Sequence, residues 1–161
     1  MPFPMEQQQE PDWCWNAVAI SVERYFDPKY KKTQQQFAVQ VLGPPLADAD
    51  QPYNLSMALS KIGLANKNLQ GYLTFPDIKS QLDANLPVCV HIAWYEGGSH
   101  YVVISGYQFS SVNAPQLLVS DPILQDDNVI VWDYDAFVLA YSPSYAEGAE
   151  GEWVDTCLVN P

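Results

Sequence analysis

The stretch QEPDWCWNAVAI, residues 9–20, decides the fold, because it puts a cysteine at the start of an amphipathic helix. Apolar residues recur at helical spacing through this stretch and beyond it, which predicts a helix over residues 13–26 with Asp12 as its N-cap. Cys14 is therefore expected in the first turn of the helix. Free backbone N–H groups and the helix dipole favour an anion at such a position.

The expected position of Cys14 suits a nucleophile. A thiolate is the reactive form of cysteine, and a helix N-terminus stabilises a thiolate. The same N–H groups can hold the oxyanion of a tetrahedral intermediate, and Gln8, separated from Cys14 by five residues, can supply a second donor. Two plainer interpretations stay open: Cys14 as a small buried apolar residue between two tryptophans, and Gln8 as part of a polar tail.

The remainder of the chain changes from helical to extended patterns. We expect further helices over residues 34–42, 53–62, 75–84 and 134–141, and Thr33 with Gln36 can make a capping box at the start of the first of these. We expect strands over residues 86–94, 101–107, 117–120, 129–133 and 152–159. Helices followed by antiparallel strands are typical of an α+β fold, and 161 residues are about one domain in length.

His100 stands at the mouth of a predicted strand, in the stretch GGSHYVVISGY (residues 97–107). The two glycines leave room for a substrate backbone, and a histidine beside them can face a cleft and take the proton of a thiol. The chain has one other histidine, His91, in the middle of the preceding predicted strand. We interpret His91 as a structural histidine because of this mid-strand position.

A carboxylate that can orient His100 follows in the stretch VSDP. Asp121 comes 21 positions after His100, at the end of the next predicted strand. A carboxylate there can bind the second imidazole nitrogen and fix the tautomer of the ring. Asp-Pro is also a common turn opener, and this simpler interpretation stays open.

The composition excludes several classes of protein. The sequence is 48% hydrophobic, as in a folded domain, and no apolar run is long enough to span a bilayer. The N-terminus lacks the pattern of a secretory signal, so we expect a cytoplasmic protein as synthesised, with delivery to another cell or non-classical secretion left open. Three widely spaced cysteines argue against a disulfide framework and a zinc cluster.

The net charge of −12 is unevenly distributed, because no Lys or Arg follows Lys79. This charge disfavours nucleic acids and anionic membranes as partners. It suits a cationic peptide or protein substrate, although acidic residues that serve solubility alone explain it equally well. The sequence gives no indication of the oligomeric state.

Taken together, three segments resemble the papain-like cysteine peptidase superfamily. They are QEPDWCWNAVAI, GGSHYVVISGY and VSDP, which occur in the family's order and extend the resemblance over nearly the whole chain. The resemblance is closest to compact bacterial members: effector proteases, staphopain-like enzymes and peptidases that trim bacteriocin leaders. It implies a two-lobe α+β fold, with a helical lobe over about residues 1–70 and a sheet lobe over about 71–161 within one domain.

The resemblance also implies the roles of four residues. Cys14 would be the nucleophile, His100 the base, Asp121 the orienting residue and Gln8 the oxyanion donor of a thiol hydrolase that acts on peptide or amide bonds. It implies no metal and no organic cofactor. The alternatives are a deamidase, transglutaminase or acyltransferase of the same fold, or an inactive peptide-binding domain. Asn16 departs from the family pattern, in which small residues follow the cysteine.

Overall fold

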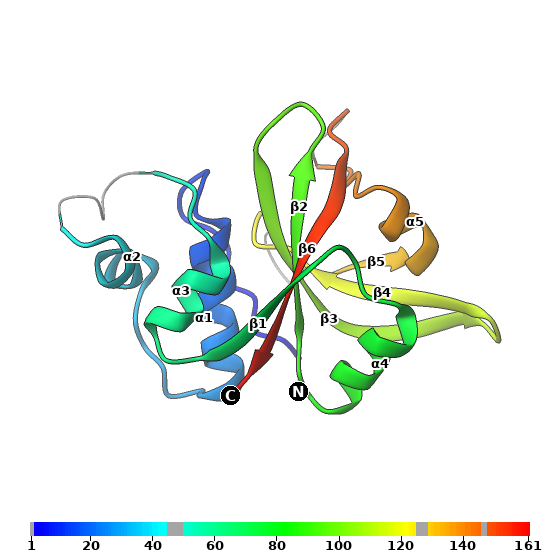
Figure 1. Ribbon diagram of the computed structural model, residues 1–161, viewed down its shortest axis with the longest axis horizontal. Coiled ribbons are helices and arrows are strands. Elements are labelled where there is room, and N and C mark those ends of the chain that lie inside the picture. Colours follow the sequence, from blue (N-terminus) through cyan, green and yellow to red (C-terminus); the bar gives the residue numbers. More distant parts are fainter. Residues whose placement is uncertain (1, 45–49, 125–128, 146–147) are drawn as a thin grey trace.

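The computed structural model describes residues 2–44, 50–124, 129–145 and 148–161. Helices dominate the first part of the chain and strands the second part, so the expected α+β class is confirmed (Figure 1). In chain order the elements are α1 (Cys14–Phe26), α2 (Gln34–Leu42), α3 (Leu55–Lys61), β1 (Ala65–Gln70), α4 (Phe75–Asp83), β2 (Val88–Trp94), β3 (Ser99–Ser111), β4 (Ala114–Ser120), β5 (Val129–Asp133), α5 (Tyr134–Leu139) and β6 (Gly151–Asn160).

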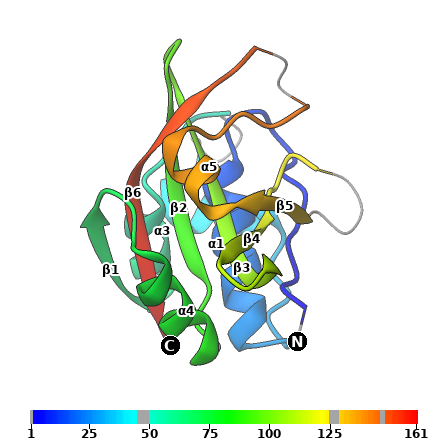
Figure 2. The same cartoon turned by 90° about the vertical axis from the view of Figure 1, so that its right-hand side faces the viewer.

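The strands form one antiparallel sheet in the order β1-β6-β2-β3-β4-β5. Helices α1, α2 and α3 lie on one face of the sheet, and α4 and α5 lie on the other (Figure 2). Successive strand residues point to opposite faces, so each face has its own core. Tyr101 and Val103 of β3 pack toward α1 and α3, whereas Val102 and Ile104 pack toward α4 and α5.

The predicted helices are present, with small shifts at their ends. The capping box of α2 is formed as expected, since Thr33 and Gln36 exchange side-chain and backbone hydrogen bonds. The prediction that Asp12 caps α1 is wrong. A turn, closed by the bond from the N–H of Trp13 to the carbonyl of Glu10 at 3.1 Å, delays the helix, so Trp13 is the N-cap and offers no capping side chain.

All five expected strands are present, and one strand was not expected. Strand β1 has the sequence ANKNLQ, which lacks an alternating apolar pattern, and it lies between two expected helices, in the part of the chain assigned to the helical lobe. It is an edge strand that pairs with β6 alone, so its side chains need not be buried on both faces. None of the helices in the described residues is long and apolar enough to cross a bilayer.

Candidate active site

Cys14 is the first residue of α1, and its side chain is 7% exposed. The helix starts where the backbone N–H groups of Asn16 and Ala17 both donate to the carbonyl of Trp13, each at 3.0 Å. The N–H of Cys14 comes before both, in the part of a helix where N–H groups have no intrahelical acceptor. Cys14 therefore lies at the positive end of the helix dipole, as the sequence predicted.

His100 is the second residue of β3, just after the turn that joins β2 to β3. Gly97 and Gly98 form this turn with φ of 103° and 86°, a left-handed backbone that glycine adopts without strain. The two glycines therefore build the turn that places His100. This role is additional to the room for substrate that the sequence suggested.

The structure brings His100 and Asp121 into direct contact. Nε2 of the His100 ring lies 2.8 Å from Oδ1 of Asp121, and both side chains are buried. Asp121 comes directly after β4, which pairs with β3, so adjacent strands carry the two residues to the same end of the sheet. Because Nε2 is engaged by the carboxylate, Nδ1 is the nitrogen left for a second partner.

The carboxylate of Asp121 accepts four hydrogen bonds. Oδ1 accepts from His100 and from the backbone N–H of Ile123 at 2.9 Å. Oδ2 accepts from the hydroxyls of Tyr141 and Tyr145. Burial alone would raise the pKa of Asp121, but the bonds from His100 and the two tyrosines lower it below its ordinary value.

Cys14 also interacts with the His100 ring. Burial opposes protonation of the ring, but the hydrogen bonds with Asp121 and with Cys14 raise the pKa of His100 to about 9. These bonds favour the protonated form of the ring. His100 and Asp121 are thus in direct contact, and Cys14 interacts with the same ring.

An aromatic stack covers the histidine–aspartate pair. The Trp94 ring lies nearly parallel to the His100 ring, with centroids 5.9 Å apart, and it also stacks on Tyr141. Gly151 of β6 makes room for this tryptophan, because a Cβ at Gly151 would lie 2.8 Å from Cε3 of Trp94. The stack keeps water from one side of the pair.

Gln8 lies in the segment that leads to α1. Its side-chain amide donates to the carbonyls of Glu10 at 2.9 Å and Pro11 at 2.7 Å, while its Oε1 is buried and finds no hydrogen-bond partner among the described residues. Its backbone N–H donates to the carbonyl of Pro122 at 2.7 Å, which joins this segment to the residue after Asp121. Both amide protons are thus used within the segment itself.

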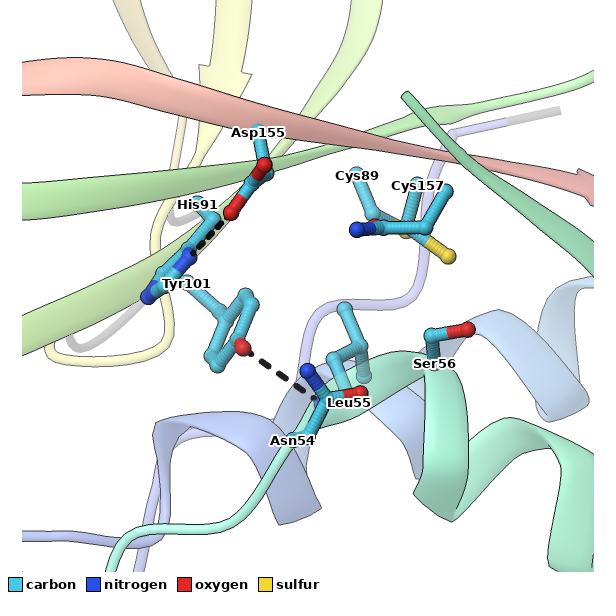
Figure 3. A pocket seen from close by; sticks show the side chains of 9 residues that line it. Asn54, Leu55, Ser56, Cys89, His91, Tyr101, Asp155 and Cys157 are labelled. Carbon is cyan, nitrogen blue, oxygen red and sulfur yellow. Dashed lines mark hydrogen bonds and ion pairs between the residues drawn. The ribbon is translucent and has the colours of Figure 1, made fainter. Parts of the chain in front are cut away.

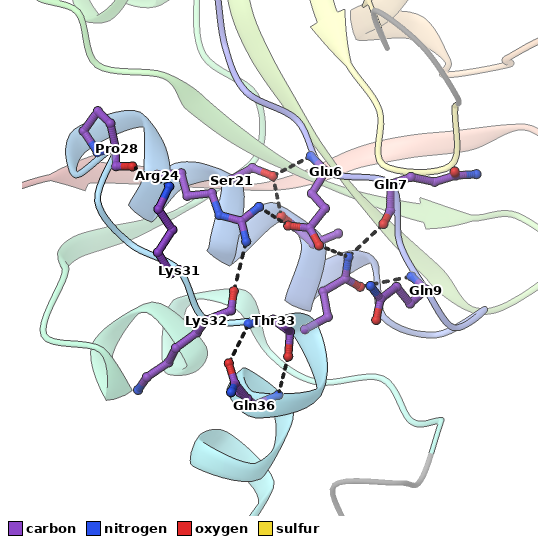
Figure 4. Close-up of polar contacts among 12 residues, drawn as sticks. Glu6, Gln7, Gln9, Ser21, Arg24, Pro28, Lys31, Lys32, Thr33 and Gln36 are labelled. Carbon is purple, nitrogen blue, oxygen red and sulfur yellow. Dashed lines mark hydrogen bonds and ion pairs between the residues drawn. The ribbon is translucent and has the colours of Figure 1, made fainter.

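A polar network holds the segment that carries Gln8 against α1 and α2 (Figure 4). The backbone N–H of Glu6 donates to Oγ of Ser21 at 2.8 Å, and the Glu6 carboxylate forms an ion pair with Arg24. Gln34, the first residue of α2, donates to the carbonyl of Gln7 at 2.7 Å. This network sets the position of Gln8 relative to Cys14.

Asn16 now has a physical explanation. It is fully buried, and its Nδ2 donates to the backbone carbonyl of Gln34 at 2.9 Å. A small apolar residue could not make this bond, which links the first turn of α1 to the first residue of α2. Oδ1 of Asn16 has no hydrogen-bond partner within the part of the chain that the structure describes.

His91 belongs to a separate pair on the opposite face of the β2–β3 hairpin. Its Nδ1 lies 3.2 Å from Oδ2 of Asp155 on β6, and its ring stacks on Tyr101 at 4.5 Å (Figure 3). The pair borders a cavity of about 10 Å³, which is room for about one water molecule. His91 thus has a polar partner of its own, as expected of a structural histidine.

The other two cysteines also border this cavity. Cys89 and Cys157 are direct cross-strand neighbours on β2 and β6, and both are buried. Burial raises the pKa of Cys157 to about 11 and raises the pKa of Cys89 well above its ordinary value. Both groups are therefore neutral thiols at neutral pH.

Three contacts of the site were not found from the sequence. Trp94 stacks on His100, and Tyr141 and Tyr145 bind Asp121. The two tyrosines come after α5 in the stretch YSPSY, which has no periodic pattern and no spacing that relates it to Asp121. Trp94 could have been placed from the hairpin, because it and His100 flank the glycine turn.

An α+β fold in which a helix-start cysteine adjoins a buried histidine–aspartate pair is consistent with papain-like cysteine peptidases. The model of the Peptidase_C39 like family matches residues 1–149, and the chain belongs to this family of cysteine peptidases. The expected superfamily is supported at this level. No curated protein matches the chain.

Proposed function

We propose that the chain hydrolyses peptide bonds, with Cys14 as nucleophile, His100 as acid and base, and Asp121 as the orienting residue. The observation that carries the proposal is the buried contact of 2.8 Å between His100 and Asp121, together with the interaction of His100 with Cys14 at the start of α1. An imidazolium stabilises a neighbouring thiolate, so Cys14 would react as the thiolate of an ion pair with His100.

The reaction would proceed in two halves. The Cys14 sulfur forms a bond to the substrate carbonyl carbon, the C–N bond breaks, and the imidazolium of His100 gives its proton to the leaving amine. Water then attacks the thioester while His100 takes a proton from it. The C–S bond breaks, the acid leaves, and the ion pair is restored.

The oxyanion would be held at the start of α1. The backbone N–H of Cys14 is a suitable donor there, because a helix N-terminus offers N–H groups without intrahelical acceptors. Gln8 would be the second donor. For this role one of its amide bonds, to the carbonyl of Glu10 or of Pro11, must open when substrate binds.

We place the substrate between the helices α1–α3 and the mouth of strand β3, in a two-lobe arrangement of the papain type. A compact bacterial effector or toxin would suit this size and acidity. The alternatives of a deamidase, transglutaminase or acyltransferase use the same thioester. They differ in which nucleophile accepts the acyl group and which amide is attacked.

Selective alkylation tests the nucleophile without a known substrate. Brief treatment with iodoacetamide at pH 7.5, followed by peptide mapping, should label Cys14 at least about tenfold faster than the two buried thiols, Cys89 and Cys157. The Cys14→Ser variant should cleave no peptide of a mixed library, whereas Cys157→Ser should cleave as the wild type does. Faster labelling of Cys89 or Cys157, or cleavage by Cys14→Ser, would overturn the assignment.

Substrate charge is a separate part of the proposal. A net charge of −12 supports attraction of Lys- and Arg-bearing peptides. Three acids lie near His100 and Asp121 in the sequence: Glu96 is exposed in the turn before His100, while Asp126 and Asp127 lie outside the described residues. We expect kcat/KM for cationic peptides to exceed that for acidic ones by a few fold at low salt and to converge at about 0.5 M salt. Equal values at low salt would mean that the acids serve solubility alone.

A further inference from the structure

The carboxylate of Asp121 is bound by two hydroxyls that the proposed mechanism does not use. Oδ1 serves His100 and the N–H of Ile123, so the whole of Oδ2 is left to Tyr141 and Tyr145. Asp121 is 0% exposed. A buried carboxylate is costly unless its oxygens are hydrogen-bonded, so these two donors determine whether Asp121 can remain an anion beside His100.

Tyr141 is held rigidly. It is fully buried, pairs with Gly151 through an isolated bridge, and packs its ring on Phe137 and Trp132. Its ring also stacks on Trp94, which in turn stacks on His100. Tyr141 therefore supports the pair in two ways. Its hydroxyl binds Asp121, and its ring packs on Trp94, which stacks on His100.

Tyr145 approaches from the segment between α5 and β6 and is only partly buried. Burial and the Asp121 carboxylate raise the pKa of both tyrosines above the ordinary value, so both stay protonated and act as donors. In the described residues, the titratable groups that contact Asp121 are His100 from β3 and these two tyrosines. Cys14 from α1 interacts with His100 and is not among the groups that shift the pKa of Asp121.

We propose that Tyr141 and Tyr145 are positioning residues, whose hydroxyls hold Asp121 as a carboxylate with one oxygen aimed at His100. The inference rests on the proposed function, because a held carboxylate matters only if His100 works beside Cys14. Without the hydroxyls, Oδ2 is buried and unsatisfied, so the carboxylate rotates or takes up a proton more readily. Either change weakens its bond to His100.

The test removes the two hydroxyls while keeping the rings. Tyr141→Phe and Tyr145→Phe should each lower kcat about tenfold with little change in KM, the size expected for one hydrogen bond to a charged group. The acid limb of the pH profile should move upward by about one unit in the double variant, because Asp121 then protonates at higher pH. Tyr134→Phe is the matched control, since its hydroxyl donates to the carbonyl of Leu73 and not to Asp121.

A readout that needs no substrate separates the two proposals. The carboxyl carbon of Asp121, identified by its loss in Asp121→Asn, should titrate at higher pH by NMR in both tyrosine variants and at the wild-type pH in Tyr134→Phe. An unchanged Asp121 titration in the double variant would overturn the positioning role, whatever its activity. Activity retained by Cys14→Ser would instead refute the proposed function and leave this titration interpretable. If the Tyr141 variants fail to fold, Tyr145→Phe alone decides the question.

Discussion

The two histidines of the chain lie on opposite faces of one hairpin, and each contacts an aspartate. His100 and Asp121 are 2.8 Å apart with side chains 4% and 0% exposed, whereas His91 and Asp155 are 3.2 Å apart with side chains 24% and 34% exposed. The first pair adjoins a cysteine at a helix start, and the second adjoins two cysteines on strands. The same residue types thus occur in two different environments.

The difference teaches that a histidine–aspartate contact is not sufficient to indicate a catalytic site. At the first pair, Asp121 is saturated by four donors and the His100 pKa rises to about 9. At the second pair, the neighbouring thiols are neutral, because burial on strands raises their pKa without a helix dipole to oppose it. The helix N-terminus, and not the pair alone, distinguishes the candidate site.

The largest expected effect is the difference in kcat between variants of the two histidines. His100→Ala should lower kcat by about 10²–10⁴-fold, because an acid and base in the transition state contributes that much. His91→Ala should change kcat less than about threefold, with a stability loss of about 1–2 kcal/mol from its lost hydrogen bond and stacking. Peptide cleavage and urea denaturation of both variants measure this. An inactive but fully folded His91→Ala beside an active His100→Ala would reverse the comparison.

Substitution of Asp121 should lower kcat more than substitution of Asp155, but the difference should be smaller than that between the two histidines. Asp121→Ala should lower kcat about 10²–10³-fold with little change in KM, because the carboxylate orients His100. Asp121→Asn should be milder, about tenfold, since an amide oxygen can still accept from the ring and the tyrosine hydroxyls can turn to accept from the amide. Asp155→Asn is the matched change at the second pair and should stay near wild type. Near-wild-type rates for both Asp121 variants would remove this residue from the site.

Much of the fold could be predicted because its signals are local. Helical spacing gave α1, and the Thr33 and Gln36 pair gave the start of α2. Strand β1 could not be found, because a polar edge strand has no alternation and is specified only by its partner β6. Asp12 was misplaced as a cap because local sequence does not show the turn that precedes Trp13.

The same distinction between local signals and long-range contacts applies to the candidate site. Cys14, His100 and Asp121 each lie at the end of an element, which a sequence marks by caps, glycines and prolines. Contacts between strands that are distant in the sequence could not be found. His91 and Asp155 are 64 positions apart and meet only because β2 and β6 are neighbours. Tyr141 reaches Asp121 from a stretch without any pattern.

The smallest expected effect is on stability, and it separates the pairs by their electrostatics. The folded pKa of His100, about 9, lies above its unfolded value of about 6.5, so its contribution is complete below pH 6.5 and is lost as pH rises through 9. Cys14 is one of the groups that raise the pKa of His100, so the measurement belongs in the inactive Cys14→Ser background, where the Asp121 bond alone supports the shift. In that background the free energy of unfolding should fall as the pH rises from 6.5 to 9. Adding His100→Gln should make this fall smaller by about 1–3 kcal/mol, because one pKa unit corresponds to about 1.4 kcal/mol. Adding His91→Gln should keep that fall, since it leaves His100 and Asp121 in place. Urea denaturation at pH 6 and pH 9.5 measures the change in the free energy of unfolding for each double variant. An equal change in the two variants would show that the His100 pair is no more strongly coupled to folding than the His91 pair.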